Sequence, residues 1–432
     1  MSSILNTIKE NPYLLWITPI LDEYPQKVYL VGGFLRDLFL KRKTSRGDLD
    51  FAISSSAIRI SRQLAKNLGA GFVILDKEHG STRIVMNREK PSEGRIFLDF
   101  TDFRGKDIQE DLLHRDFTIN SMAVDLRDIK KANKLEDIPL DSYQARKDIE
   151  KRAIRVISVK SFPEDPLRIL RAFSLSSVLD FKIEPKTIAQ IKKYKKKIPS
   201  CAFERITEEL FKILNSPNAF KTISLMDTLR ILDEIIPEIK IMRGVKQGPY
   251  HHLDVYRHSL ETLKQLEIVF YELKRNKNIQ NYLNEVISGT RTRRALLKFA
   301  AFLHDIGKPA AKKHFKGKTR FHGHERIGRN MARDIAERLR LSNDERVALS
   351  RIIFWHLRPG YIADMEKITP RASFRFFRDT AGEAASVLLL SIADQRSTRG
   401  PLTRGNDRKH HQDVCLRMAK EFFRKAKEQR PG

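Results

Sequence analysis

The chain has 432 residues, and its 82 Lys and Arg against 54 Asp and Glu give a formal net charge of +28. Solubility requires far less charge, so this excess predicts an acidic polymer such as RNA as a partner. Basic runs near residues 192, 274, 291 and 312 are scattered, which suggests a long track for phosphates. The length allows two or three domains.

Hydropathy and cysteine content favour an internal, reducing environment. No apolar run approaches the roughly 20 residues of a membrane span, and the N-terminus has no signal-peptide pattern. The two cysteines, Cys201 and Cys415, are far apart and offer neither a disulfide framework nor a zinc site. We therefore expect a cytoplasmic protein that does not enter a membrane, and the sequence leaves its oligomeric state open.

The first informative element is an apolar run, KVYLV, followed by Gly32 and Gly33. The run predicts a short strand, and the glycines allow a sharp turn that brings backbone N–H groups close to an anion. FLRDLFL then begins a helix that leaves Arg36 facing the same pocket. These residues predict a triphosphate site.

Two carboxylates follow on one predicted strand. Asp48 and Asp50 flank Leu49, so alternation places both carboxylates on one face and Leu49 in the core. Such a pair can hold two Mg²⁺ ions for an in-line phosphoryl displacement. Asp99, on a neighbouring predicted strand, is a candidate third catalytic carboxylate, although an ordinary Asp on an edge strand explains the pattern equally well.

The glycine pair, the Arg-Asp pair and the D-x-D run together resemble the signature of the polymerase-beta nucleotidyltransferase superfamily. Two later runs, HRDFTINSMAVDL at 114–126 and EDPLRILRAF at 164–173, are similar to motifs of class II tRNA nucleotidyltransferases and bacterial poly(A) polymerases. The resemblance implies roles for further residues in nucleotide binding: Arg115, Asp116 and Asn120 at the ribose, Asp165 and Arg168 at the base, and Arg171 nearby. It also implies contacts with the triphosphate at Gly33 and Arg36.

Base reading by Asp165 and Arg168 has a physical basis. The two residues are three positions apart, which places them on one helix face, and together they offer acceptor oxygens and a fork of donors. Such a pair can imitate a Watson–Crick edge and reject a wrong base. The alternative is structural, because Asp165-Pro166 also reads as a helix cap and Arg168 as a surface residue.

After residue 160 the pattern becomes helical, and a second metal chemistry follows. Histidines and aspartates occur in the order H, HD, H, H, D and resemble the HD-domain metal phosphohydrolases, with His258, His304, Asp305, His324, His356 and Asp394 as expected ligands. Imidazole and carboxylate sets of this kind bind Mn, Ni, Co or Mg²⁺. Hydrolysis and a merely structural or RNA-binding role both remain open for this domain.

The sequence therefore predicts an α+β fold: a polymerase-beta-like head with a small mixed sheet at 1–160, an all-α neck at 161–245, an all-α HD domain at 246–400 and a basic helix or tail at 401–432. The expected activity is CCA or CC addition to the tRNA acceptor end from CTP and ATP, with Mg²⁺ at the head. Alternatives are a poly(A) polymerase, an HD phosphohydrolase with a non-catalytic head, and a purely RNA-binding protein.

The chain departs from the family pattern at three places. His114 replaces the first Arg of the R-R-D motif, and Gln144-Ala145 occupies the place of a hinge glycine pair. Only GKDIQ separates Arg104 from Glu110, where members that add all of CCA usually carry a flexible loop. Short loops of this kind resemble the CC-adding members, whereas HD-containing relatives could also trim this loop and compensate elsewhere.

Overall fold

The computed structural model describes residues 2–42, 48–87, 95–132, 140–248, 251–315, 318–401 and 405–428. Parts of the basic run at 312–320 and of the expected C-terminal basic segment lie outside these residues. The chain divides into two compact units, Met1–Arg168 with Asp180–Tyr194, and Ile169–Leu179 with Lys195–Gly432.

The first unit is built on a six-stranded mixed sheet, in the order β3-β4-β5-β2-β1-β6. Only β2 and β5 pair in parallel, and the other neighbours are antiparallel. The strands are β1 (Val28–Val31), β2 (Asp48–Ile53), β3 (Gly71–Asp76), β4 (Ser81–Asn87), β5 (Arg95–Asp102) and β6 (Ala123–Asp125). The predicted mixed sheet of the head is thereby confirmed.

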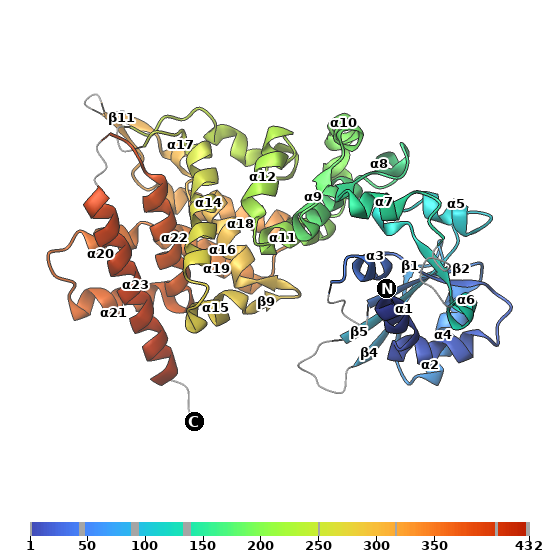
Figure 1. Cartoon of the computed structure of the whole chain (residues 1–432). Coiled ribbons are helices and arrows are strands. Elements are labelled where there is room, and N and C mark those ends of the chain that lie inside the picture. The colour runs from blue at the N-terminus through green and yellow to red at the C-terminus, as the bar shows by residue number, and fades with distance from the viewer. Residues whose placement is uncertain are drawn as a thin grey trace. The chain divides into compact units, whose positions relative to one another are not determined.

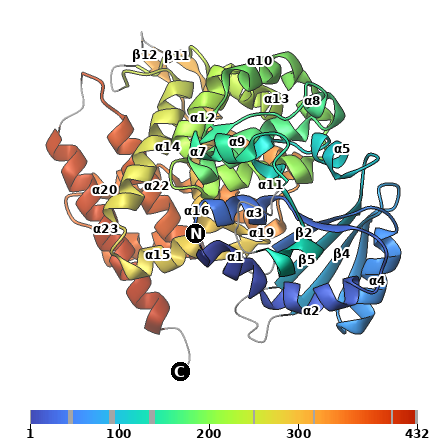
Figure 2. The ribbon, with the colours of Figure 1, turned by 45° about the vertical axis from the view of Figure 1, so that its right-hand side comes forward.

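The two faces of this sheet differ in character. On β5, Ile96, Leu98 and Phe100 are buried, whereas Phe97 and Asp99 between them are only partly covered. Helix α4 (Ala57–Asn67) packs against β3, β4 and β5, and Figure 2 shows it beside these strands. The other, more open face carries the polar side chains of the candidate site.

Short helices and one small parallel ribbon complete the first unit. The helices are α1 (Ser2–Lys9), α2 (Pro12–Leu21), α3 (Gly33–Phe39), α5 (Ile108–Leu113), η2 (Thr118–Asn120), α6 (Leu126–Lys131), α7 (Ala145–Glu150), α8 (Ser161–Glu164) and α10 (Pro185–Tyr194). The ribbon pairs β7 (Ala153–Ile154) with β8 (Lys182–Ile183). Helix α9 (Leu167–Leu179) contains the point at which the chain passes into the second unit.

The second unit is helical apart from two short antiparallel ribbons, as Figure 1 shows. Besides most of α9 it contains η4 (Lys195–Ser200), α11 (Phe203–Asn215), α12 (Ala219–Thr228), α13 (Leu232–Ile235), η5 (Pro237–Met242), α14 (Val255–Glu272), α15 (Lys277–Asn284), α16 (Arg293–Leu303), α17 (Lys308–Ala311), α18 (His324–Arg338), α19 (Asn343–Trp355), α20 (Arg358–Ala363), α21 (Pro370–Thr380), η6 (Ala381–Glu383), α22 (Ala384–Ser397) and α23 (Gly405–Glu428). The ribbons pair β9 (Val286–Ser288) with β10 (Arg291–Thr292) and β11 (Lys313–Phe315) with β12 (Lys318–Arg320).

Two helices form the centre of this second unit. Every residue of α16 from Ala295 to Leu303 is buried, and α22 is buried from Ala384 to Ala393. A helix that is apolar on all sides requires neighbours on all sides. Helix α14 packs against both of them. Among the described residues, no helix combines the length and the apolar character that a membrane crossing needs.

Candidate functional sites

The predicted pair of carboxylates lies on β2, at its start. Asp48 and Asp50 are exposed, while Leu49 between them is 1% exposed and enters the core. In the parallel register of β2 and β5, the Cα of Asp50 is paired with that of Asp99. Paired residues of neighbouring strands share a face, so three carboxylates occur on two adjacent strands. This arrangement agrees with the alternation read from the sequence.

Asp99 is engaged by an arginine that the sequence did not single out. Arg83 on β4 donates from Nε and Nη2 to the two carboxylate oxygens of Asp99, each at 2.7 Å. The guanidinium also lies over the ring of Phe97, 4.8 Å from its centroid. The hydrogen bonds that Arg83 donates to Asp99 raise the pKa of Arg83 against the opposing effect of burial, and the charges of Asp50 and Asp48 raise it further. Arg83 is therefore a fixed cation beside the carboxylates.

The glycine turn lies against the same centre. Gly32 has a φ of 82°, and a Cβ built on it would lie 2.7 Å from Oδ2 of Asp50 and 3.5 Å from Nη1 of Arg115. Any other residue at this position would therefore adopt a strained backbone conformation, and its Cβ would clash with the carboxylate of Asp50. Gly33 begins α3, and a Cβ there would lie 3.3 Å from Nη2 of Arg36.

Residues of two separate motifs form one hydrogen-bonded chain. Arg36 donates from Nη1 to Oδ1 of Asn120 at 2.7 Å, and Asn120 donates from Nδ2 to Oδ1 of Asp116 at 3.0 Å. The same Asp116 oxygen accepts from the backbone N–H of Phe117. Asp116 and Asn120 are both buried. The structure thus brings together the residues for which the resemblance implied triphosphate and ribose contacts.

Arg168 is buried in the first unit and binds backbone. Its Nη2 donates to the carbonyl oxygen of His114 at 2.6 Å, and its Nη1 donates to those of Arg115 and Ser161 at 3.4 and 3.3 Å. Burial lowers its pKa against the opposing carboxylates, beginning with Asp116. The idea that Arg168 is an ordinary surface residue is therefore wrong.

Asp165 is not part of the helix that carries Arg168. It ends α8 with extended backbone, and its Oδ1 accepts from the N–H of Leu167, the first residue of α9. The expectation that Asp165 and Arg168 share one helix face is thus corrected, because the X-Pro step before Pro166 favours extended backbone. Arg171, one turn after Arg168 on α9, is exposed. Base reading by these residues stays a prediction.

The second unit assembles the six predicted metal ligands from five segments. His258 lies on α14 and Asp394 on α22, whereas His324 begins α18. The remaining three follow helix ends: His304 and Asp305 come directly after α16, and His356 directly after α19. All four histidines and Asp305 are at least 95% buried. This clustering agrees with the H, HD, H, H, D order.

The ring orientations of three histidines suit metal binding. Nδ1 of His304, His324 and His356 lies 2.9, 2.8 and 2.6 Å from the backbone carbonyl oxygens of Ala301, Phe321 and Ile353. A proton on Nδ1 leaves the Nε2 lone pair for a metal. Each Nε2 is buried and makes no hydrogen bond within the described part of the chain. These orphaned nitrogens fit a metal centre.

Asp305 lies between two groups of candidate ligands. One group is His258, His304 and Asp305, and the other is Asp305, His324 and His356, with ligand atoms within 4.8 Å of one another. Oδ2 of Asp305 lies 3.2 Å from Nε2 of His304, and its Oδ1 lies 3.3 Å from Nε2 of His324. Asp305 would thus serve both groups of ligands, and their mixed nitrogen and oxygen donors suit transition metals.

The electrostatics of this cluster reflect closely packed imidazoles and carboxylates. Burial opposes the charged form of His304, but Asp305 and Asp394 outweigh it and raise the pKa of His304 to about 10. Burial, with His304 and His324 as further causes, lowers the pKa of His356 to about 3. Although burial alone would raise it, His304 and Lys308 hold the pKa of Asp305 well below its usual range.

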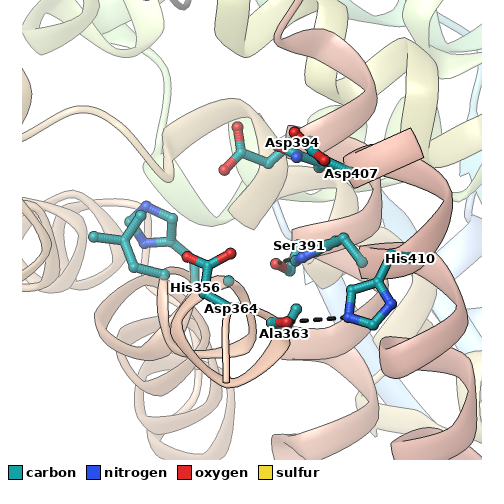
Figure 3. A pocket seen from close by; sticks show the side chains of 11 residues that line it. His356, Ala363, Asp364, Ser391, Asp394, Asp407 and His410 are labelled. Atoms are coloured by element: carbon teal, nitrogen blue, oxygen red, sulfur yellow. Dashed lines mark hydrogen bonds between the residues drawn. The ribbon is translucent and has the colours of Figure 1, made fainter. Parts of the chain in front are cut away.

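A cavity of about 330 Å³ adjoins this cluster. His356 and Asp394 line it on the side of the cluster, and Asp364, Asp407 and His410 line it elsewhere. Figure 3 shows these side chains around the cavity, with His410 bonded to the carbonyl oxygen of Ala363. Carboxylates and imidazoles therefore dominate its wall, so it is a polar pocket.

Several functional candidates were missed by reading the sequence. Lys308 lies 2.7 Å from Oδ2 of Asp305 and donates to Oε1 of Gln247 at 2.7 Å. The ring of His251 packs edge-on against that of His258, with centroids 4.8 Å apart. Lys308 stands in the HDIGK run, where its three-residue spacing from Asp305 was an available signal. Arg83 and His251 carried no comparable signal.

Comparison with known proteins agrees with these two centres. Residues 28–155 match the poly(A) polymerase head domain, 180–242 a probable RNA and SrmB-binding site of polymerase A, and 255–399 the HD domain. The fold and sites thus define a nucleotidyltransferase with an appended HD domain.

Similar proteins place the chain in a family. It is 30% identical over 390 residues to an A-adding tRNA nucleotidyltransferase of Deinococcus radiodurans, covering 89% of this chain and 79% of that protein. A CC-adding tRNA nucleotidyltransferase of Thermus thermophilus is 26% identical over 383 residues, covering 87% and 77%. The chain therefore belongs to the class II tRNA nucleotidyltransferase and poly(A) polymerase family, in a form with an HD domain.

Solved structures share the fold. A tRNA nucleotidyltransferase complexed with a primer tRNA and an incoming ATP analog has a TM-score of 0.63 at 20% identity, covering 95% of this chain and 99% of that one. The Thermotoga maritima CCA-adding enzyme complexed with tRNA has a TM-score of 0.62 at 21% identity, covering 95% and 82%.

Proposed function

We propose that this protein is a tRNA nucleotidyltransferase that adds nucleotides of the 3′-terminal CCA sequence to tRNA from CTP and ATP, with release of pyrophosphate. One observation carries the proposal: Asp48 and Asp50 stand exposed on one strand, and Asp50 lies directly against the glycine turn at Gly32. The tRNA and nucleotide substrates are supported by the names of the relatives and by the complexes of the similar structures. Since tRNA and both nucleotides are cytoplasmic, we place the activity in the cytoplasm.

The oxygen-only donor set of Asp48 and Asp50 suits Mg²⁺. When bound there, a pair of Mg²⁺ ions would activate the RNA hydroxyl and neutralise the leaving pyrophosphate. The backbone N–H groups at Gly33 lie at the start of α3, where an anion is favoured. Arg36, held by Asn120, would bind the same triphosphate. Catalysis is then largely positioning and charge neutralisation.

The test is an addition assay with tRNA lacking CCA. Asp48→Asn and Asp50→Asn should each lower the addition rate by about 10³-fold, because they remove metal ligands that stabilise the transition state. The affinity for RNA should change by no more than about twofold, since the basic surface supplies it. Wild-type rates in both variants would contradict the assignment. Long A tracts made from ATP alone would favour a poly(A) polymerase.

A second activity is supported by the HD cluster. We infer that it is a divalent-metal phosphohydrolase centre, because three buried imidazole Nε2 atoms, which make no hydrogen bond to any described residue, converge on Asp305. A bound Mn, Ni, Co or Mg²⁺ ion would supply a nucleophilic hydroxide. Hydrolysis of a 2′,3′-cyclic nucleotide or a phosphate monoester by the wild type, lost in His304→Ala, tests this activity. Equal rates in both proteins would contradict it.

A further inference from the structure

The open face of the head sheet carries a row of charged side chains across three strands. Arg83 on β4 pairs in register with Asp99 on β5, and Asp99 pairs with Asp50 on β2. Beyond β2, the register of β1 places Val31 opposite Asp50, and Gly32 follows it. Figure 2 shows β4, β5 and β2 beside one another. The carboxylate centre is thus flanked by the glycine turn on one side and by Arg83 on the other.

Arg83 is anchored but retains donors. Its Nε and Nη2 bind both oxygens of Asp99, and its guanidinium packs over the ring of Phe97. Within the described residues, Nη1 makes no hydrogen bond. The side chain as a whole is 37% exposed. An oriented arginine with unused N–H groups is well suited to a phosphate.

The geometry of the displacement indicates which phosphate Arg83 would bind. In an in-line displacement the attacking hydroxyl and the leaving pyrophosphate lie on opposite sides of the α-phosphorus. The proposed function, on which this step rests, places the pyrophosphate near Gly32, Gly33 and Arg36. The RNA 3′ end must then approach from the side of β5 and β4, where Arg83 lies.

We propose that Arg83 binds the backbone phosphate next to the 3′-terminal nucleotide of the RNA, and that Asp99 is its positioning residue. Both oxygens of Asp99 are occupied by Arg83. In this arrangement Asp48 and Asp50 hold the metal, while Asp99 orients the guanidinium. The alternative predicted from the sequence, that Asp99 is a third catalytic carboxylate, is tested against this role below.

The first experiment measures RNA binding without nucleotide, by fluorescence anisotropy of tRNA lacking CCA over a range of salt. Arg83→Gln should weaken binding about fivefold to tenfold and reduce the slope of log affinity against log salt by about 0.7 to 1, the value for one phosphate contact. Arg83→Lys keeps the charge but loses the paired N–H donors of the guanidinium, so its tRNA affinity should lie between those of the wild type and Arg83→Gln. Arg59→Gln, an exposed arginine on α4 on the other face, is the matched control and should change the affinity by less than about twofold.

The second experiment separates RNA from nucleotide. In addition assays, Arg83→Gln should raise KM for tRNA about tenfold and leave KM for CTP within about twofold. A raised KM for CTP with unchanged tRNA affinity would overturn the proposal, because Arg83 would then serve the triphosphate. This binding readout is separate from the proposed function, which fails only if Asp48→Asn and Asp50→Asn both retain addition.

The positioning role of Asp99 is tested by combining its substitution with that of Arg83. If Asp99 acts only by orienting Arg83, Asp99→Asn should weaken tRNA binding, and the Arg83→Gln/Asp99→Asn variant should match Arg83→Gln in kcat and tRNA affinity. Binding of Mn²⁺ to the head, followed by electron paramagnetic resonance in a full-length Asp305→Ala background, should then be equal in the double variant and the parent within about twofold. A loss of Mn²⁺ affinity of about tenfold or more in the double variant would make Asp99 a metal ligand and overturn its positioning role.

Discussion

Gly32 touches the carboxylate of Asp50 so closely that no side chain fits between them. A Cβ built on Gly32 would lie 2.7 Å from Oδ2 of Asp50, and the φ of 82° at Gly32 is in a region that other residues rarely adopt. The glycine turn and the D-x-D strand therefore form one unit. We infer that Gly32 sets the position of the Asp50 carboxylate, the candidate metal ligand.

The first prediction compares the two glycines. Gly32→Ala should lower the addition rate by about 10²-fold or more, because the methyl group must displace Asp50 from its position. Gly33→Ala should lower it by less than about tenfold, because the added Cβ meets only the end of the flexible Arg36 side chain, at 3.3 Å. Circular dichroism and melting temperature should confirm folding of both variants. Equal rates in the two variants would argue against a special role for Gly32.

The second prediction concerns the shared carboxylate of the HD cluster. Asp305→Ala should remove bound metal at both candidate positions, because both groups of ligands include Asp305. His324→Ala should remove metal from only one group, so its metal content should lie between the contents of Asp305→Ala and the wild type. Elemental analysis after dialysis against Mn²⁺ measures this. His322→Ala, an exposed histidine nearby, is the control.

Nucleotide addition by the head should be unchanged in all three variants. Equal metal contents in Asp305→Ala and the wild type would exclude a centre built on Asp305. A content in His324→Ala as low as that in Asp305→Ala would indicate a single ion bound by both groups instead of two separate ions.

Local patterns in the sequence predicted much of both sites. Alternation placed Leu49 in the core and Asp48 and Asp50 outside it, because side-chain direction along a strand depends only on the strand itself. The order of His and Asp residues, through its resemblance to HD-domain proteins, likewise singled out side chains that the structure brings together as candidate ligands. These features require no knowledge of which elements become neighbours.

Contacts between distant elements could not be predicted in this way. Arg83 meets Asp99 only because β4 and β5 pair in a particular register. Arg168 is buried because α9 begins beside the carbonyls of His114 and Arg115, more than fifty residues earlier in the chain. The assumption that Asp165 belongs to that helix was wrong for a local reason, the extended backbone before Pro166.

The third prediction separates base reading from capping. Asp165→Asn keeps a side-chain oxygen for the N–H of Leu167, so stability should change by less than about 0.5 kcal/mol, but it replaces an acceptor by a donor toward the base. Discrimination by kcat/KM of CTP and ATP against UTP and GTP should fall by about tenfold or more. Full selectivity in Asp165→Asn would reduce this residue to a helix cap.

Arg168→Ala provides the contrasting case. This variant should lose both selectivity and stability, the latter by about 1–3 kcal/mol, because the carbonyl oxygens of His114 and Ser161 lose their donor. Urea unfolding measures the stability. A variant as stable as the wild type would contradict the buried contacts described for Arg168.

The last prediction concerns how far addition proceeds. The segment between Arg104 and Glu110 is a tight turn: Asp107 caps α5 by accepting from the N–H of Glu110, and a Cβ on Gly105 would lie 2.4 Å from that of Glu110. No long loop is available there to close over the site and help to assemble it for a second nucleotide. Gln144, with a φ of 61° at the start of α7, replaces a hinge glycine at the cost of strained backbone. We therefore expect the protein to add two C residues readily and the final A slowly or not at all.

Gel analysis of tRNA lacking CCA, or ending in C or CC, incubated with CTP and ATP singly and together, measures the product. Efficient completion of tRNA ending in CC would contradict CC-only addition, and addition of A alone would instead give it the specificity named for the Deinococcus radiodurans relative.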